Sequence, residues 1–192
     1  MIYGFLARDE TSPAVLIDKN ESVPLLNKGK AIRKQWSTES LLIRRKSGRT
    51  TDFIFSSVGP AFSARARDVL APLFGDSVEW LQLITIRKTD YFVINVLEPV
   101  DCIDYSRSRV LYSDDEHPVI LMVSQIVFDE TKLPKACIFV AKHDHHVYVS
   151  EAVVDAIRKN HLTGACFFDP AANILKLSYD HIDLNIVPYL PL

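Results

Sequence analysis

The run His143-Asp144-His145-His146 is the part of the sequence whose residue types are best suited to chemistry. Imidazole and carboxylate groups are ligands for zinc, copper and nickel. Neighbouring side chains of a strand point to opposite faces, so only His143 and His145 would converge easily. A structural zinc site usually has four ligands, and no Cys/His pair at ligand spacing supplies the others. We expect an exposed polar turn without a metal. The alternative is a metal-dependent or otherwise cryptic enzyme centred on this run.

A second group of ionisable side chains is acidic and lies between residues 101 and 116. It comprises Asp101, Asp104, Asp114, Asp115 and Glu116, five carboxylates within sixteen residues. The polar run before Pro118 predicts a loop, and loops often carry recognition. We expect these carboxylates to contribute to docking of a partner, although Asp101 and Asp104 equally suit a turn after the preceding strand. The competing surface is the basic segment from Lys28 to Arg49, which would suit an acidic partner.

Several familiar catalytic and cofactor motifs are missing from the sequence. The six glycines are scattered, so a loop that cradles phosphate is poorly supported. No GxSxG or HExxH motif occurs, and no Cys–His arrangement suggests a nucleophile. We therefore expect no catalytic residues and no cofactor.

The elements that would position these residues predict an α+β fold with mostly antiparallel strands and a few short helices. Helices are expected over about 64–74, between Ser63 and Gly75, and over 151–160 after Ser150. Pro72 is a difficulty for the first helix, because proline lacks a backbone hydrogen-bond donor and favours an earlier end. Residues 78–97 predict a β-hairpin. Further strands are expected at 2–7, 14–17, 41–43, 53–55, 119–128, 136–140, 147–149, 165–168 and 174–177.

Two parts of the chain share the same order of predicted elements. Strand 53–55 is followed by a helix after Ser63, and strand 138–140 by a helix after Ser150. Each helix carries an aspartate five residues after that serine, Asp68 and Asp155. The pattern suggests a duplicated strand–helix–strand unit, but coincidence explains it equally well because capped helices between strands are common.

Composition limits the class of protein. With 192 residues, 48% of them hydrophobic, the chain is long enough for a substantial core. Its formal net charge of −2 gives no drive toward nucleic acid or an anionic membrane. We see no signal peptide and no apolar run long enough to span a bilayer. Three separated cysteines with apolar neighbours, Cys102, Cys137 and Cys166, predict buried thiols in a reducing compartment, and hence a cytoplasmic protein.

Three segments carry a resemblance to a known family. The first is Tyr91-Phe92-Val93-Ile94-Asn95-Val96-Leu97, followed by Asp101, Asp104 and Ser108. The second is Ile126-Val127-Phe128-Asp129-Glu130 with Leu133-Pro134 and Ile138-Phe139. The third is Val147-Tyr148-Val149-Ser150, then Leu162-Thr163-Gly164 and Phe167. In order and spacing they resemble bacterial polymorphic-toxin immunity-protein family eleven, formerly a domain family of unknown function. The resemblance covers roughly residues 60–170.

This resemblance implies a non-enzymatic protein, encoded beside a toxin, that binds and neutralises it. The expected partner is therefore a cognate protein toxin, not nucleic acid or a membrane. The family does not imply a particular toxin, and we carry no contact residues over from it. We expect residues 51–192 to form the family-like α+β domain, and residues 1–50 to be a basic, strand-containing segment of the same fold.

Overall fold

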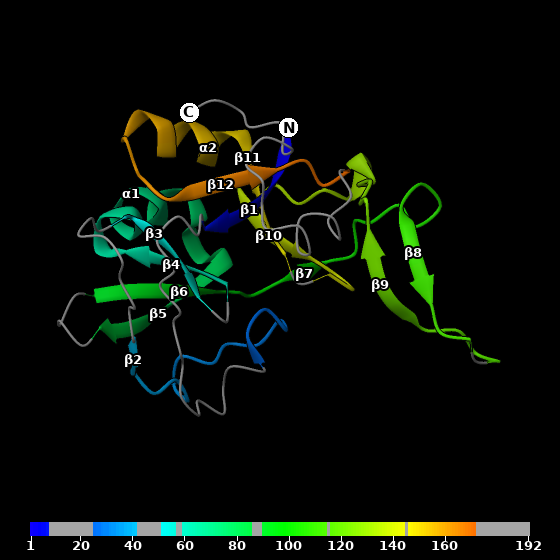
Figure 1. Cartoon of the computed structure of the whole chain (residues 1–192), viewed down its shortest axis with the longest axis horizontal. Coiled ribbons are helices and arrows are strands. Elements are labelled where there is room, and N and C mark those ends of the chain that lie inside the picture. The colour runs from blue at the N-terminus through cyan, green and yellow to red at the C-terminus, as the bar shows by residue number, and fades with distance from the viewer. Residues whose placement is uncertain are drawn as a thin grey trace.

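The computed structural model describes residues 1–7, 25–41, 51–56, 59–85, 90–114, 116–144 and 146–171. These residues form two five-stranded sheets, a separate two-stranded hairpin and two α-helices (Figure 1). Among the strand pairs of the described residues, β7–β10 and β2–β5 are parallel and the others are antiparallel. The predicted α+β class with mostly antiparallel strands is confirmed.

The first sheet has the strand order β12-β1-β11-β10-β7. Its strands are β12 (Ala165–Phe168), β1 (Ile2–Ala7), β11 (Val147–Ser150), β10 (Ile138–Ala141) and β7 (Pro99–Val100). The second sheet has the order β2-β5-β6-β4-β3. Its strands are β2 (Glu39–Leu41), β5 (Val78–Thr85), β6 (Asp90–Val96), β4 (Gly59–Ser63) and β3 (Phe53–Ser56). The hairpin joins β8 (Arg109–Tyr112) to β9 (Ile120–Ser124).

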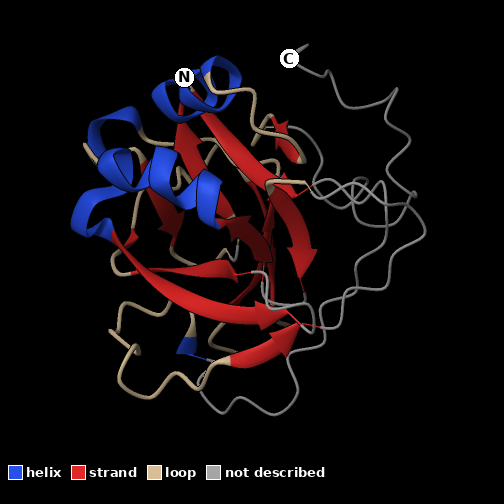
Figure 2. Ribbon diagram, turned by 90° about the vertical axis from the view of Figure 1, so that its left-hand side faces the viewer, coloured by secondary structure: helices blue, strands red, loops and turns tan. Residues whose placement is uncertain are grey.

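The main core lies between the inner faces of the two sheets and the helices α1 (Ala64–Phe74) and α2 (Glu151–Lys159). Alternation along each strand divides the side chains between two faces. In β11, Val147 and Val149 join the main core, whereas Tyr148 points to a second cluster on the opposite face. The helices contact each other, and Figure 2 shows them together on one side of the strands.

The two predicted repeats adopt the same topology. In one, the antiparallel pair β3–β4 leads into α1 and then β5; in the other, β10–β11 leads into α2 and then β12. A further antiparallel strand lies between the outer members of each unit: β6 separates β4 from β5, and β1 separates β11 from β12. The structure therefore shows two hairpin–helix–strand units, each completed by a strand from elsewhere in the chain.

The helix boundaries follow the predicted caps, except that α2 ends at Lys159, one residue before the predicted end. The Ser63 hydroxyl accepts a hydrogen bond from the Ala66 amide at 3.1 Å, and Gly75 ends α1. The predicted end of this helix at Phe74 is confirmed, because Pro72 lies within the last turn and does not shorten the helix. Ser150 occupies the N-cap position of α2, but its side chain makes no capping hydrogen bond.

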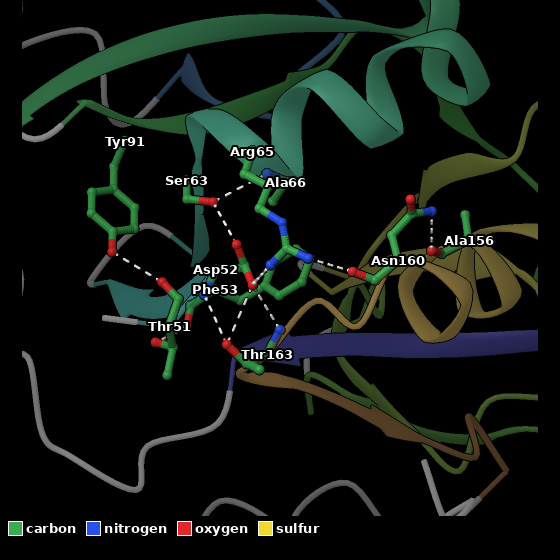
Figure 3. A network of polar contacts seen from close by, with 10 residues as sticks. All are labelled: Thr51, Asp52, Phe53, Ser63, Arg65, Ala66, Tyr91, Ala156, Asn160 and Thr163. Atoms are coloured by element: carbon green, nitrogen blue, oxygen red, sulfur yellow. Dashed lines mark hydrogen bonds and ion pairs between the residues drawn. The ribbon is translucent and has the colours of Figure 1, made fainter. Parts of the chain in front are cut away.

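A polar network centred on Asp52 joins the two units (Figure 3). Its carboxylate accepts hydrogen bonds from the Ser63 hydroxyl at 3.0 Å, from the Arg65 guanidinium at 3.1 Å and from the Thr163 amide at 2.9 Å. Arg65 also donates to the carbonyl of Asn160, the last residue of the α2 region. A single carboxylate thus links the start of α1 to the loop between α2 and β12.

Residues 25–36 cover the outer face of the second sheet, where Leu26 and Ile32 are buried. Two neighbouring side chains on β5 and β6 hold the backbone of this segment. Glu79 accepts from the Ile32 amide at 2.7 Å, and Asn95 donates to the Lys30 carbonyl at 2.8 Å. Burial alone would raise the pKa of Glu79, but hydrogen bonds from Ile32, Asn95 and Arg33 outweigh it and hold that pKa below its usual value.

The remaining strand predictions have mixed outcomes. The strand expected over 119–128 is shorter, because Gln125 adopts a left-handed conformation with φ 52° just after β9 ends. Hairpin strands β5 and β6 are confirmed as a pair, and their register places Asp90 opposite Ile84. The strands expected at 14–17 and 174–177, and residues 42–43 of another, lie outside the described residues.

Candidate partner-binding site

The β8–β9 hairpin, residues 109–124, projects from the body of the molecule (Figure 1). Its base is fixed through Ser108, whose hydroxyl accepts a hydrogen bond from the Val127 amide at 2.9 Å. Near the base, Val110 and Val123 are paired and lie against the second cluster on the first sheet. The base is therefore part of the fold, whereas the distal half extends beyond it.

The distal half exposes an unusual set of apolar side chains. Apart from Met1, every exposed large hydrophobic side chain among the described residues belongs to this hairpin. The set, here called the apolar patch, is Leu111 (51% exposed), Tyr112 (46%), Val119 (58%) and Leu121 (61%). Single exposed apolar residues are ordinary, but a group on one projecting element is typical of a binding site.

The acidic tip, residues 113–118, lies directly beside the apolar patch. The loop is closed by Ser113 and Val119, since the Ser113 amide donates to the Val119 carbonyl at 2.9 Å and the Val119 amide to the Ser113 hydroxyl at 3.0 Å. Asp114 and Glu116 are exposed, and Asp115 between them is outside the described residues. The tip contains three carboxylates and no lysine or arginine.

The other two predicted contact residues lie at the base and engage the protein itself. Asp104 accepts from the Ser106 hydroxyl at 2.6 Å and is 4.0 Å from the Arg107 guanidinium. The Ser106 hydroxyl is the largest influence that lowers the pKa of Asp104. Asp101 is 3.8 Å from the Lys142 ammonium group. The structure therefore separates the four described carboxylates into a tip group, Asp114 and Glu116, and a base group, Asp101 and Asp104, that engages neighbouring side chains.

The competing basic segment is described only in part. Lys28, Lys30, Arg33 and Lys34 have exposed side chains on the segment that covers the second sheet. Arg44, Arg45, Lys46 and Arg49 lie outside the described residues. In the described part of the basic segment, no exposed large apolar side chain accompanies the lysines and arginines. Among all described residues, such side chains occur only at Met1 and on the hairpin.

The histidine-rich run does not bring its described members together. His143 adopts a left-handed turn conformation with φ 62°, and its ring contacts Tyr105. His146 instead pairs with Asp144, whose carboxylate oxygen is 2.9 Å from the His146 Nδ1. His145 is outside the described residues, and no group of three metal-ligating side chains gathers among those that are described.

The Asp144–His146 pair is joined by the hydroxyl of Tyr148. Tyr148 donates to Asp144 at 2.6 Å, this hydroxyl is fully buried, and burial raises its pKa well above the usual range. A phenol held in its protonated form acts as a structural hydrogen-bond donor. These hydrogen bonds connect the end of the turn to the interior of the first sheet through Tyr148.

The apolar patch is the feature that sequence reasoning missed. The hydrophobic segment 119–128 predicts a strand. A hydrophobic sequence pattern is the same whether the side chains pack in the protein's own core or against a partner. The available signal was the neighbouring acidic loop, which places the start of the run close to solvent. A projecting hairpin with exposed apolar and acidic side chains is typical of surfaces that bind other proteins.

Comparison with known families identifies the chain. It matches the sequence profile of the Immunity protein family (Imm11) over residues 10–172. Because this span covers most of the 192 residues, the chain belongs to that family. The matched region also includes part of residues 1–50, for which the sequence alone showed no resemblance. A comparison with curated proteins finds no match. No helix in the described parts of the chain has the length and apolar character needed to cross a membrane.

Proposed function

We propose that this chain is a non-enzymatic, cytoplasmic immunity protein that binds and neutralises a cognate protein toxin, with the β8–β9 hairpin as its contact element. Membership of an immunity family supports the function. The observation that carries the proposal is that, among the residues that the structure describes, every exposed large apolar side chain except Met1 lies on one projecting hairpin. Exposed apolar groups on such an element are costly in a free protein unless a partner covers them.

The acidic tip suits a partner with a basic surface. Asp114 and Glu116 are exposed, and no lysine or arginine lies within residues 113–118 to compensate them. Toxins that act on nucleic acid need basic surfaces to hold phosphate, and an acidic loop can occupy such a surface. Charges at the rim of an interface mainly accelerate association and contribute little each to affinity.

The first test is binding to the product of the neighbouring toxin-like gene. The two proteins should co-purify, and the wild-type association rate should decrease as salt is added. The double variant Asp114→Lys/Glu116→Lys should associate at least about tenfold more slowly at low ionic strength, with the difference shrinking toward physiological salt.

A matched control variant distinguishes an effect of the tip carboxylates on association from an effect of net charge alone. Asp68→Lys/Asp76→Lys reverses the same number of charges at exposed positions on α1 and the turn after it. This control should leave the association rate within about twofold of wild type. Equal slowing by both pairs would show that only net charge matters, and failure of the two wild-type proteins to associate would contradict the proposed function.

A further inference from the structure

The geometry points to the apolar patch, Leu111, Tyr112, Val119 and Leu121, as the part of the hairpin that holds the toxin once it has docked. We infer that these side chains enter an apolar pocket on the toxin that is bordered by lysine or arginine. This inference rests on the proposed function and deepens it, because it assigns duration of binding to the apolar patch and speed of binding to the acidic tip.

The first support is that the hairpin's own fold does not use the patch. Val110 and Val123 pair near the base and are packed against the body. One step further out, Leu111 pairs with Met122 on the opposite face, and Leu111 remains 51% exposed. Ile120 still packs against the second cluster, whereas Leu111 and Leu121 are mostly exposed, so these two leucines are not used by the core.

A second support is the irregular register of the hairpin. Leu111 pairs with Met122, but Tyr112 pairs with Ile120, so Leu121 is an additional residue in β9. Such a bulge changes the direction of a side chain and increases local twist, and bulges are frequent beside functional sites. Leu121 is 61% exposed, the largest fraction in the patch. The irregularity thus presents a leucine to solvent where a regular ladder would continue the alternation.

The surrounding charge favours a basic partner over a second copy of this chain. The patch adjoins the acidic tip, with Tyr112 and Val119 on either side of residues 113–118. A second copy covering the patch through its own patch would bring another set of tip carboxylates close to the first, and like charges in contact oppose association. A toxin with a cationic border would neutralise the tip while its apolar pocket removes the patch from water.

The kinetics of binding separate these roles. In the full-length protein, Leu111→Ser and Leu121→Ser should each increase the dissociation rate from the toxin by about tenfold or more, while changing the association rate less than about twofold. Asp114→Lys/Glu116→Lys should show the reverse pattern. Leu121→Met retains an apolar side chain of similar volume and should keep the wild-type dissociation rate within about threefold.

Two measurements on the free protein test whether the leucine substitutions alter its stability or its oligomeric state. Leu111→Ser and Leu121→Ser should leave the melting temperature unchanged within about 1 °C, because exposed side chains contribute little to folding. Light scattering should give the same mass for wild type and variants. A melting temperature lowered by several degrees would show that the leucines pack against their own chain and would overturn the inference. A wild-type dimer dissociated by these substitutions would do the same, since a second copy would then be the occupant.

The inference and the proposed function fail in different ways. If wild type binds the toxin but the leucine variants dissociate at the wild-type rate, the patch is not the centre of the interface and only this inference is wrong. If the wild-type protein does not bind the toxin at all, the proposed function itself is contradicted, and the inference with it.

Discussion

Replacing Asp52 by alanine tests the physical connection between the two halves of the fold. The carboxylate is 90% removed from solvent, since its side chain is only 10% exposed, and its oxygens accept hydrogen bonds from Ser63, Arg65 and Thr163. Alanine removes all of these acceptors at once. It also frees the Ser63 hydroxyl, which caps α1 through the Ala66 amide.

The size of the effect follows from the individual contacts. Hydrogen bonds to a charged group contribute roughly 1.5–3 kcal/mol each when protected from water. The Arg65 side chain is 57% exposed, so its ion pair is worth at most about 1 kcal/mol. The Thr163 amide belongs to an exposed residue that water can partly solvate. We therefore expect Asp52→Ala to lower the free energy of unfolding by about 3 kcal/mol.

Urea unfolding and thermal melting measure this loss. In a chain of this length, about 3 kcal/mol corresponds to a melting temperature lower by about 6–12 °C. Asp52→Asn keeps the shape and one acceptor oxygen, so it should lose only about 1–2 kcal/mol. Asp68→Ala is the control, because its carboxylate is 66% exposed and contacts only the neighbouring Arg67. If Asp52→Ala and Asp68→Ala have the same small effect, the network does not join the two units.

Three further predictions concern titration, reactivity and metal. The pKa of Glu79 is lower in the folded protein than in the unfolded chain, so its contribution to stability is complete above its unfolded pKa and is lost as pH falls through the folded pKa. Glu79→Gln should thus be less stable than wild type near neutral pH, and the difference should shrink in urea titrations between about pH 5 and about pH 3. Burial raises the pKa of the Cys102 thiol to about 11, whereas Cys137 is partly exposed. Alkylation of native protein at about pH 8 should therefore modify Cys137 first, and faster labelling at Cys102 would refute its burial. A chelator should not change the melting temperature if the histidine-rich run is a polar turn, whereas a fall of many degrees would show a structural metal.

Local elements were predictable because short-range physics determines them. Apolar residues at helical spacing, the hydroxyl of Ser63 and the glycine at position 75 together predict the bounds of α1. Pro72 does not shorten the helix, because a proline in the last turn removes only one backbone donor while packing of Leu70 and Phe74 maintains the helix.

Long-range pairing was not predictable from local pattern. β1 lies between β11 and β12, strands more than 130 residues away from it in the sequence. No local preference of residues 2–7 specifies that position, which depends on the fit of two distant strands. The same reasoning applies to the segment 25–36, whose place is determined by Glu79 and Asn95.

The sequence predicted the acidic part of the candidate site but not its apolar part. The carboxylates of the tip are evident from sequence, and Asp114 and Glu116 are exposed as a loop requires. The exposure of Leu111 and Leu121 was not predictable, because hydrophobicity predicts burial and does not say against which molecule. Only the three-dimensional arrangement shows that the fold leaves these side chains without a core of their own.

The most direct test of the central claim is a titration of toxin activity with this protein. The product of the neighbouring gene is held at a fixed concentration well above the dissociation constant, and its activity is measured as the immunity protein is added. A non-enzymatic inhibitor that binds the toxin predicts a linear decrease to zero at a fixed molar ratio, with no further change over time. Inactivation that continues with time at a small fraction of that ratio would reveal an enzyme, and full toxin activity at molar excess would show that this chain does not neutralise it.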